Sequence, residues 1–121
     1  MKMVNEFGQF ITENVFDKSV NYYLKLKLGE WKESNMQNIY SDLSKLSEED
    51  KKLVDKIASN IIYYTVSTVL LALQESYDGK KGYSITFNDT DICSQESEMN
   101  SGTLYGELQD WIEEYSNYKD F

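Results

Sequence analysis

The 121-residue chain lacks histidine and arginine and has one cysteine, Cys93. Without histidine there is no Ser-His-Asp or Cys-His pair to activate a nucleophile, and no histidine-containing zinc site. Without a second cysteine no intrachain disulfide can form, which fits a reducing compartment. Cys93 has no partner base and lies in a predicted strand, so a structural thiol is favoured over a nucleophile. We therefore predict a protein that is not an enzyme and has no cofactor and no metal centre.

The absence of arginine leaves lysine to carry every positive charge, and 12 lysines face 21 acidic residues, for a net charge of −9. Phosphate binding needs a basic surface, usually with arginine, so we expect no nucleic-acid partner. The charge is unevenly placed. Residues 1–60 contain nine lysines and ten acidic residues, whereas residues 61–121 contain three lysines and eleven acidic residues. The C-terminal half therefore carries the negative field.

The N-terminal segment offers no export signal. Glu6 and Glu13 fall where such a signal would need an uninterrupted apolar stretch. Together with the lone cysteine, this predicts a cytoplasmic protein.

An 18-residue stretch without charge, residues 57–74, could be a membrane span, a buried helix or a strand. Polar residues interrupt it and no aromatic belts or lysine asymmetry flank it, which disfavours a span. It is too long for one strand. Ser47 is a helix-start signal and Gly79 a helix-end signal. We therefore interpret the stretch as part of a helix over residues 48–77, buried among other helices and not in a membrane.

Apolar residues at helical spacing predict three further helices, near residues 4–28, 35–46 and 103–118. The chain has the size of one domain with one core, and no repeat or low-complexity linker divides it. We predict a single domain, residues 1–121, of α+β class but mainly α, with about four helices around the long central helix. The apolar face of the first helix is expected to contain Val4, Phe7, Ile11, Val15, Tyr22 and Leu26.

After the long helix the pattern changes from helical spacing to alternation of apolar and polar residues, as in a strand. With Asp89-Thr90 as a two-residue turn, Phe87 would lie opposite Ile92. We expect a β-hairpin over residues 83–94. An isolated hairpin is marginal, so it would pack on a helix or pair with a second chain, and a homodimer is compatible with the sequence.

Acidic residues gather in the segment 89–98, and hard cations take carboxylate ligands. An EF-hand loop that began at Asp89 would need Gly at its sixth position and Glu at its twelfth, where the chain has Ser94 and Asn100. The EF-hand is excluded. A looser site stays open, and the alternative function is a carboxylate-based metal-dependent enzyme, or a small-ligand-binding protein, that uses this loop. The acidic residues are Asp89, Asp91, Glu96 and Glu98.

The last predicted helix mixes aromatic rings with carboxylates. Rings surrounded by acid suit a basic protein partner, because the acids steer the encounter and the rings hold the contact. In the alternative interpretation the rings cover the core and the acids keep the surface soluble. The candidate partner-binding residues are Tyr105, Glu107, Asp110, Trp111, Glu113, Glu114, Tyr115 and Tyr118.

Residues 47–118 combine a long helix ending in "LLALQES", a hairpin, and the segment "SGTLYGELQDWIEEYSNY". This combination resembles a group of small uncharacterised bacterial proteins that end in a Gly-Glu-Leu-Tyr-Gly-Glu and Trp-Ile pattern, with Thr103 here in place of the first Glu. The resemblance implies a bacterial cytosolic origin and no particular activity. Small size, acidity and the last helix together predict a protein-binding module, of the immunity or antitoxin kind that blocks a basic toxin.

Overall fold

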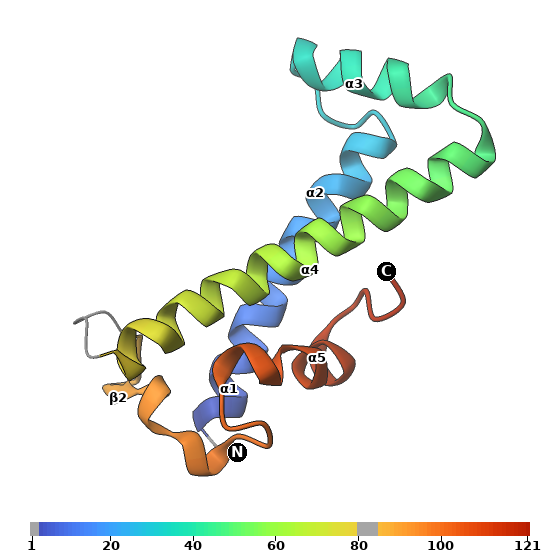
Figure 1. Ribbon diagram of the computed structural model, residues 1–121. Coiled ribbons are helices and arrows are strands. Elements are labelled where there is room, and N and C mark those ends of the chain that lie inside the picture. Colours follow the sequence, from blue (N-terminus) through green and yellow to red (C-terminus); the bar gives the residue numbers. More distant parts are fainter. Residues whose placement is uncertain (1–2, 80–84) are drawn as a thin grey trace.

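A computed structural model describes residues 3–79 and 85–121. Within these residues the chain forms four helical rods and one two-stranded hairpin (Figure 1). The α+β class, mainly α, and the long central helix are confirmed. The helical segments are α1 Met3–Ile11, the π-helical turn η1 Thr12–Phe16, α2 Asp17–Lys27, α3 Ser34–Ser44, α4 Glu48–Asp78 and α5 Leu104–Tyr115.

The first rod runs without a break through α1, η1 and α2, and its π-helical turn rotates the apolar face. Its apolar core residues are three or four positions apart on each side of η1, whereas five positions separate Ile11 from Phe16, with the fully buried Thr12 between them. The wider turn of a π-helix accommodates this step. The expected single face is therefore wrong in part: Val15 and Tyr22 are exposed, while Phe16 and Val20 are buried.

Helix α4 begins where the sequence predicts, because the Ser47 hydroxyl accepts a 3.1 Å hydrogen bond from the backbone N–H of Asp50. It packs through one stripe, Val66, Leu70 and Gln74, at intervals of four residues. The expectation that other elements bury it all round is not met, since 17% of its most apolar 18-residue window is buried. By length and composition alone it is the one described helix that could cross a membrane.

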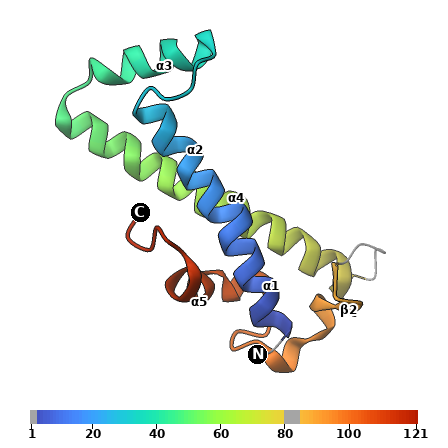
Figure 2. The ribbon, with the colours of Figure 1, turned by 180° about the vertical axis from the view of Figure 1, so that it is seen from behind.

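The core lies toward one end of the molecule. The first rod crosses α4, and α5 lies beside that crossing, whereas α3 stands at the far end of α4 (Figures 1 and 2). No residue of α3 is buried. The buried apolar side chains are Val4, Phe7, Phe16, Val20, Val66, Leu70, Ile92, Cys93, Met99, Leu104, Leu108, Trp111 and Ile112.

The hairpin is shorter than predicted and differs in register. Strand β1, Thr86–Phe87, pairs antiparallel with β2, Thr90–Asp91, and Phe87 lies opposite Thr90. The turn is Asn88-Asp89, one residue before the predicted turn. Both of its residues have positive φ (50° and 63°), which Asn and Asp tolerate and which a tight hairpin turn requires.

Beyond the hairpin the predicted strand is replaced by short 3₁₀ turns, η2 Ile92–Ser94 and η3 Glu96–Glu98. The Asp91 carboxylate accepts a 3.0 Å hydrogen bond from the N–H of Cys93, which favours a turn over further pairing. The predicted start of the hairpin, at residues 83–84, lies outside the described residues.

Candidate functional site

Glu107, a predicted partner-binding residue, is turned inward and holds the start of α5. Its carboxylate accepts hydrogen bonds from the N–H of Asn100 (2.8 Å), the N–H of Ser101 (3.0 Å) and the Ser101 hydroxyl (2.8 Å). The side chain is 3% exposed. In the first turn of α5 its charge also faces the positive end of the helix dipole. Glu107 therefore has a structural role in this chain.

Trp111 is also interior. It is 2% exposed, and its ring meets that of Phe7 edge to face, with 6.0 Å between centroids. The indole lies directly against Gly8, where a Cβ atom would overlap it. Trp111 is therefore a core residue. This agrees with the alternative interpretation of the sequence, in which the rings of the last helix cover the core.

The remaining predicted residues divide into an exposed set and a half-buried set. Tyr115 and Tyr118 are half-buried and pack against the core. Burial, and then the Glu114 carboxylate, raise the pKa of the Tyr115 hydroxyl. The exposed residues, called here the α5 acidic face, are Tyr105, Asp110, Glu113 and Glu114.

No ion pair that involves the α5 acidic face occurs within the described ranges, where lysines pair with Asp55 and Glu48 instead. Glu113 accepts a 3.1 Å hydrogen bond from the amide of Gln109, one turn earlier. From residue 85 to residue 121 the chain has nine acidic residues and a single lysine, Lys119. The α5 acidic face therefore presents uncompensated negative charge.

Helix α5 ends three residues before its predicted end at residue 118. Ser116 takes an extended backbone conformation, with ψ of 145°. Its hydroxyl donates a 2.6 Å hydrogen bond to Asp17, and the N–H of Asn117 donates to the same carboxylate at 3.0 Å. Tyr118 consequently lies beyond the helix and not on its stripe.

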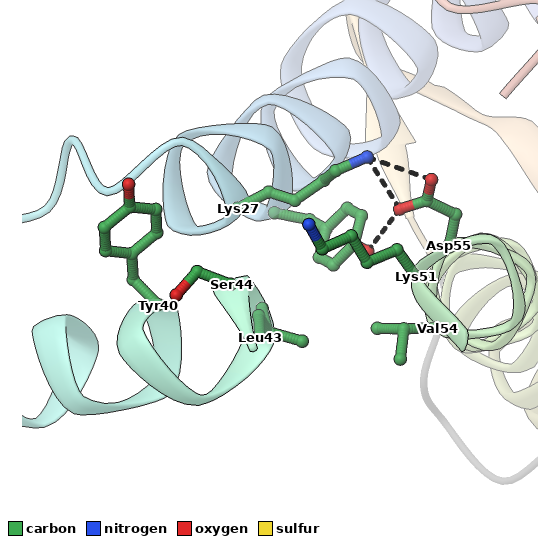
Figure 3. A pocket seen from close by; sticks show the side chains of 8 residues that line it. Lys27, Tyr40, Leu43, Ser44, Lys51, Val54 and Asp55 are labelled. Carbon is green, nitrogen blue, oxygen red and sulfur yellow. Dashed lines mark hydrogen bonds and ion pairs between the residues drawn. The ribbon is translucent and has the colours of Figure 1, made fainter. Parts of the chain in front are cut away.

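A polar pocket that the sequence did not reveal lies between α2, α3 and α4 (Figure 3). It has a volume of about 250 Å³. On one wall Tyr23 donates a 2.5 Å hydrogen bond to Asp55, and Lys27 lies 2.9 Å from the same carboxylate. Lys51, one turn before Asp55 on α4, pairs with Glu48 of the same helix at 3.2 Å. The Tyr23, Lys27 and Asp55 contacts brace α2 against α4.

The protonation states in this pocket follow from the same contacts. Burial, and then the bond to Asp55, raise the pKa of the Tyr23 hydroxyl. For Asp55, burial alone would raise the pKa of the carboxyl group. The hydrogen bonds from Tyr23 and Lys27 and the charge of Lys27 outweigh the effect of burial, so the pKa of Asp55 lies below its ordinary value. The pair therefore holds a neutral phenol beside a charged carboxylate at neutral pH.

Two carboxylates of the acidic segment 89–98 accept hydrogen bonds from backbone N–H groups. Asp91 binds the N–H of Cys93, and Glu98 accepts a 3.3 Å hydrogen bond from the N–H of Val4. In residues 3–79 and 85–121 no group of three Asp, Glu, Cys or His side chains is placed to hold a metal ion. Cys93 is fully buried, and burial, followed by the charge of Asp91, raises the pKa of its thiol.

An apolar groove runs along the crossing of the first rod with α4. It consists of two adjoining hollows of about 610 Å³ and about 230 Å³. Both are lined by Val15 and Ser19 from the rod and by Ile61 and Ile62 from α4. The repeated apolar residues were visible in the sequence, but the rotation at η1 that turns Val15 toward this groove was not.

Comparisons of the chain with protein-family models, curated protein sequences and solved structures gave no match. The resemblance of residues 47–118 to a group of small bacterial proteins therefore stays a prediction.

Proposed function

We propose that the chain is a non-enzymatic, acidic protein of the bacterial cytoplasm that binds a basic protein through the α5 acidic face, in the manner of an immunity protein or antitoxin. The observation that carries the proposal is the exposure of Asp110, Glu113 and Glu114 on one helix, where no lysine of residues 3–79 or 85–121 pairs with any of them.

Uncompensated charge of this kind favours fast capture of a basic partner. Carboxylates on one surface create a field that extends about 10 Å at 0.1 M salt and speeds encounter. An isolated exposed carboxylate adds little affinity, so contact must also involve rings and backbone. Tyr105, in the first turn of the same helix, is an exposed ring that adds such contact beside the carboxylates.

The helix that carries the face is fixed at three points. The Glu107 carboxylate ties its first turn to residues 100–101, Trp111 anchors its middle in the core, and Asp17 holds the residues that follow its end. A surface held rigid before binding loses less conformational entropy when a partner docks. Glu107 and Trp111 thus serve the interaction by positioning α5 and not by touching the partner.

Affinity capture from a lysate of the native organism, followed by mass spectrometry, tests the proposal with three baits. The wild-type chain should retain a basic protein, and the Glu113→Lys/Glu114→Lys variant should lose it. Glu30→Lys/Glu33→Lys, a matched change of charge on exposed residues before α3, should keep it. Equal recovery with all three baits, or recovery of no basic protein with any of them, would contradict the proposal.

A further inference from the structure

A second surface, distinct from the α5 acidic face, is apolar and lies on α4. We name it the α4 apolar face. Its side chains are between 51% and 62% exposed, an unusual degree for large apolar residues that follow one another along one helix. Four of them lie within the uncharged stretch 57–74, whereas Leu53 precedes it and has the exposed Glu49 and Lys56 one turn away. The residues are Leu53, Ile57, Ile61, Tyr64 and Val69.

The α4 apolar face adjoins the apolar groove. Ile61 and Val69 stand at its edge and line the hollows, while Val15 and Tyr22 form part of the opposite wall. Both of these wall residues are exposed as well. One continuous patch therefore contains a ridge, made by α4, and a groove, made by α4 with η1 and α2.

The accessible surface of the chain is larger than that of a compact monomer of the same mass. The accessible surface is 7711 Å². A compact monomer of this mass is expected to expose about 6,700 Å², so the excess is roughly 1,000 Å². A standard protein interface covers about 800 Å² on each partner. The excess is comparable to the area that one ordinary interface covers, and the exposed helix α3 contributes to it along with the α4 apolar face.

We propose that the partner on this patch is a second copy of the chain, packed with its α4 antiparallel to the first and with the two-fold axis between Ile61 and Tyr64. A two-fold interface requires a patch that complements itself, and this patch has the ridge and the groove side by side. In the dimer the two α4 ridges lie against each other across the axis, and the groove of each chain opens beside this contact. Antiparallel α4 helices also bring opposite ends of the helix dipoles together.

This proposal goes beyond the binding of a basic protein and does not depend on it. The dimer forms through apolar contact between two chains of net charge −9, so salt should strengthen it by screening their repulsion. Capture of a basic partner by the α5 acidic face should instead weaken in salt. The two interactions are therefore separable by the direction of their salt dependence.

Sedimentation equilibrium measures the association directly. The wild-type chain should have twice the mass of one chain at about 100 µM, whereas Ile61→Lys should raise the dissociation constant by about 30-fold or more. Leu28→Lys changes an equally exposed apolar residue outside the patch and should leave the dimer intact. Circular dichroism should show the same helix content for all three proteins, because both sites are exposed.

A monomeric wild-type chain at this concentration would overturn the proposal, as would a dimer that Ile61→Lys does not weaken. The proposal would also be overturned if the wild-type chain stays monomeric in buffer and co-floats with phosphatidylcholine vesicles in a density gradient. Lipid would then be the occupant of the α4 apolar face.

Disulfide trapping tests the antiparallel arrangement. In that arrangement residue 57 of one chain lies opposite residue 68 of the other, and both positions are exposed. A mixture of Ile57→Cys and Thr68→Cys chains should form a mixed disulfide, whereas neither variant alone should link to itself. Native Cys93 is fully buried and provides an unreactive background. Links within each variant alone, or no links in the mixture, would contradict the arrangement.

Discussion

The Ser116 hydroxyl donates a 2.6 Å hydrogen bond to the carboxylate of Asp17, although 99 positions separate the two residues. Both are buried, and the second carboxylate oxygen accepts from the N–H of Asn117. The contact joins the start of α2 to the end of α5. The position of the C-terminal segment therefore depends on a residue near the middle of the first rod.

Replacing Asp17 with Ala should lower the free energy of unfolding by about 2–4 kcal/mol, because two donors lose a charged acceptor in a buried site. Urea unfolding followed by circular dichroism measures this. Glu13→Ala, at an exposed carboxylate of the preceding turn, should change stability by no more than about 0.5 kcal/mol. Similar effects of the two substitutions would refute the role given to Asp17.

The Glu107→Gln substitution tests whether Glu107 holds the start of α5. The amide has one acceptor oxygen for three donors, so a loss of about 1–3 kcal/mol in unfolding free energy is expected. Glu113→Gln, on the exposed side of the same helix, is the matched control and should be nearly neutral. A neutral Glu107→Gln would mean that its hydrogen bonds contribute little to stability.

Gly8→Ala should destabilise the chain, although alanine favours a helix over glycine by about 1 kcal/mol. The new methyl group would overlap the indole of Trp111, and overpacking of a core costs about 1–3 kcal/mol. Adding Trp111→Phe should recover part of the loss, because the smaller ring leaves room for the methyl group. Thermal melting of the single and double variants measures the coupling, and simple additivity would argue against the contact.

The ion pair between Asp55 and Lys27 should stabilise the fold in a pH-dependent way. The pKa of Asp55 is lowered from 3.8 in the folded chain, so its contribution is present above that value and is lost as the pH falls through the folded pKa. Because the pair is about one third exposed, we expect no more than about 1 kcal/mol. The stability difference between wild type and Asp55→Asn should therefore shrink as pH decreases from 7 to about 3. A difference that stays constant would contradict this assignment.

The metal-dependent alternative can be tested by thermal melting in calcium, magnesium or manganese. Asp91 and Glu98 already accept backbone hydrogen bonds, so we expect no rise in melting temperature. A rise of several degrees would favour a metal site in residues 89–98, because a ligand that binds the folded state alone stabilises it. Asp89→Asn/Glu96→Gln should then abolish the rise.

The sequence predicted the helices well because helix starts and ends have local causes. Ser47 places its hydroxyl on the N–H of Asp50, and this depends on neighbouring residues alone. The rotation of the apolar face at η1 depends instead on tertiary packing. Phe16 and Val20 are buried in the core, whereas Val15 and Tyr22 are exposed. A straight-helix pattern assigns all apolar residues to one face and cannot reveal this division.

The candidate site was predicted in part for a similar reason. Spacing placed Glu107 and Trp111 on α5 with the exposed carboxylates, but the contacts of Glu107 with residues 100–101 and of Trp111 with Gly8 are tertiary. Composition alone does not distinguish a ring in the core from a ring on a contact surface. The polar pocket at Asp55 was missed because its partners, Tyr23 and Lys27, lie about 30 positions away in the chain.

The most direct test of the proposed function is the association rate of the captured basic partner with the chain, measured by stopped flow at about 0.05 M and about 0.5 M salt. If the α5 acidic face steers the encounter, the rate should fall by about 10-fold or more at the higher salt, and Glu113→Lys/Glu114→Lys should lower both the rate at low salt and its salt dependence. A rate that is independent of salt, or that is the same for the wild type and this variant, would contradict the account.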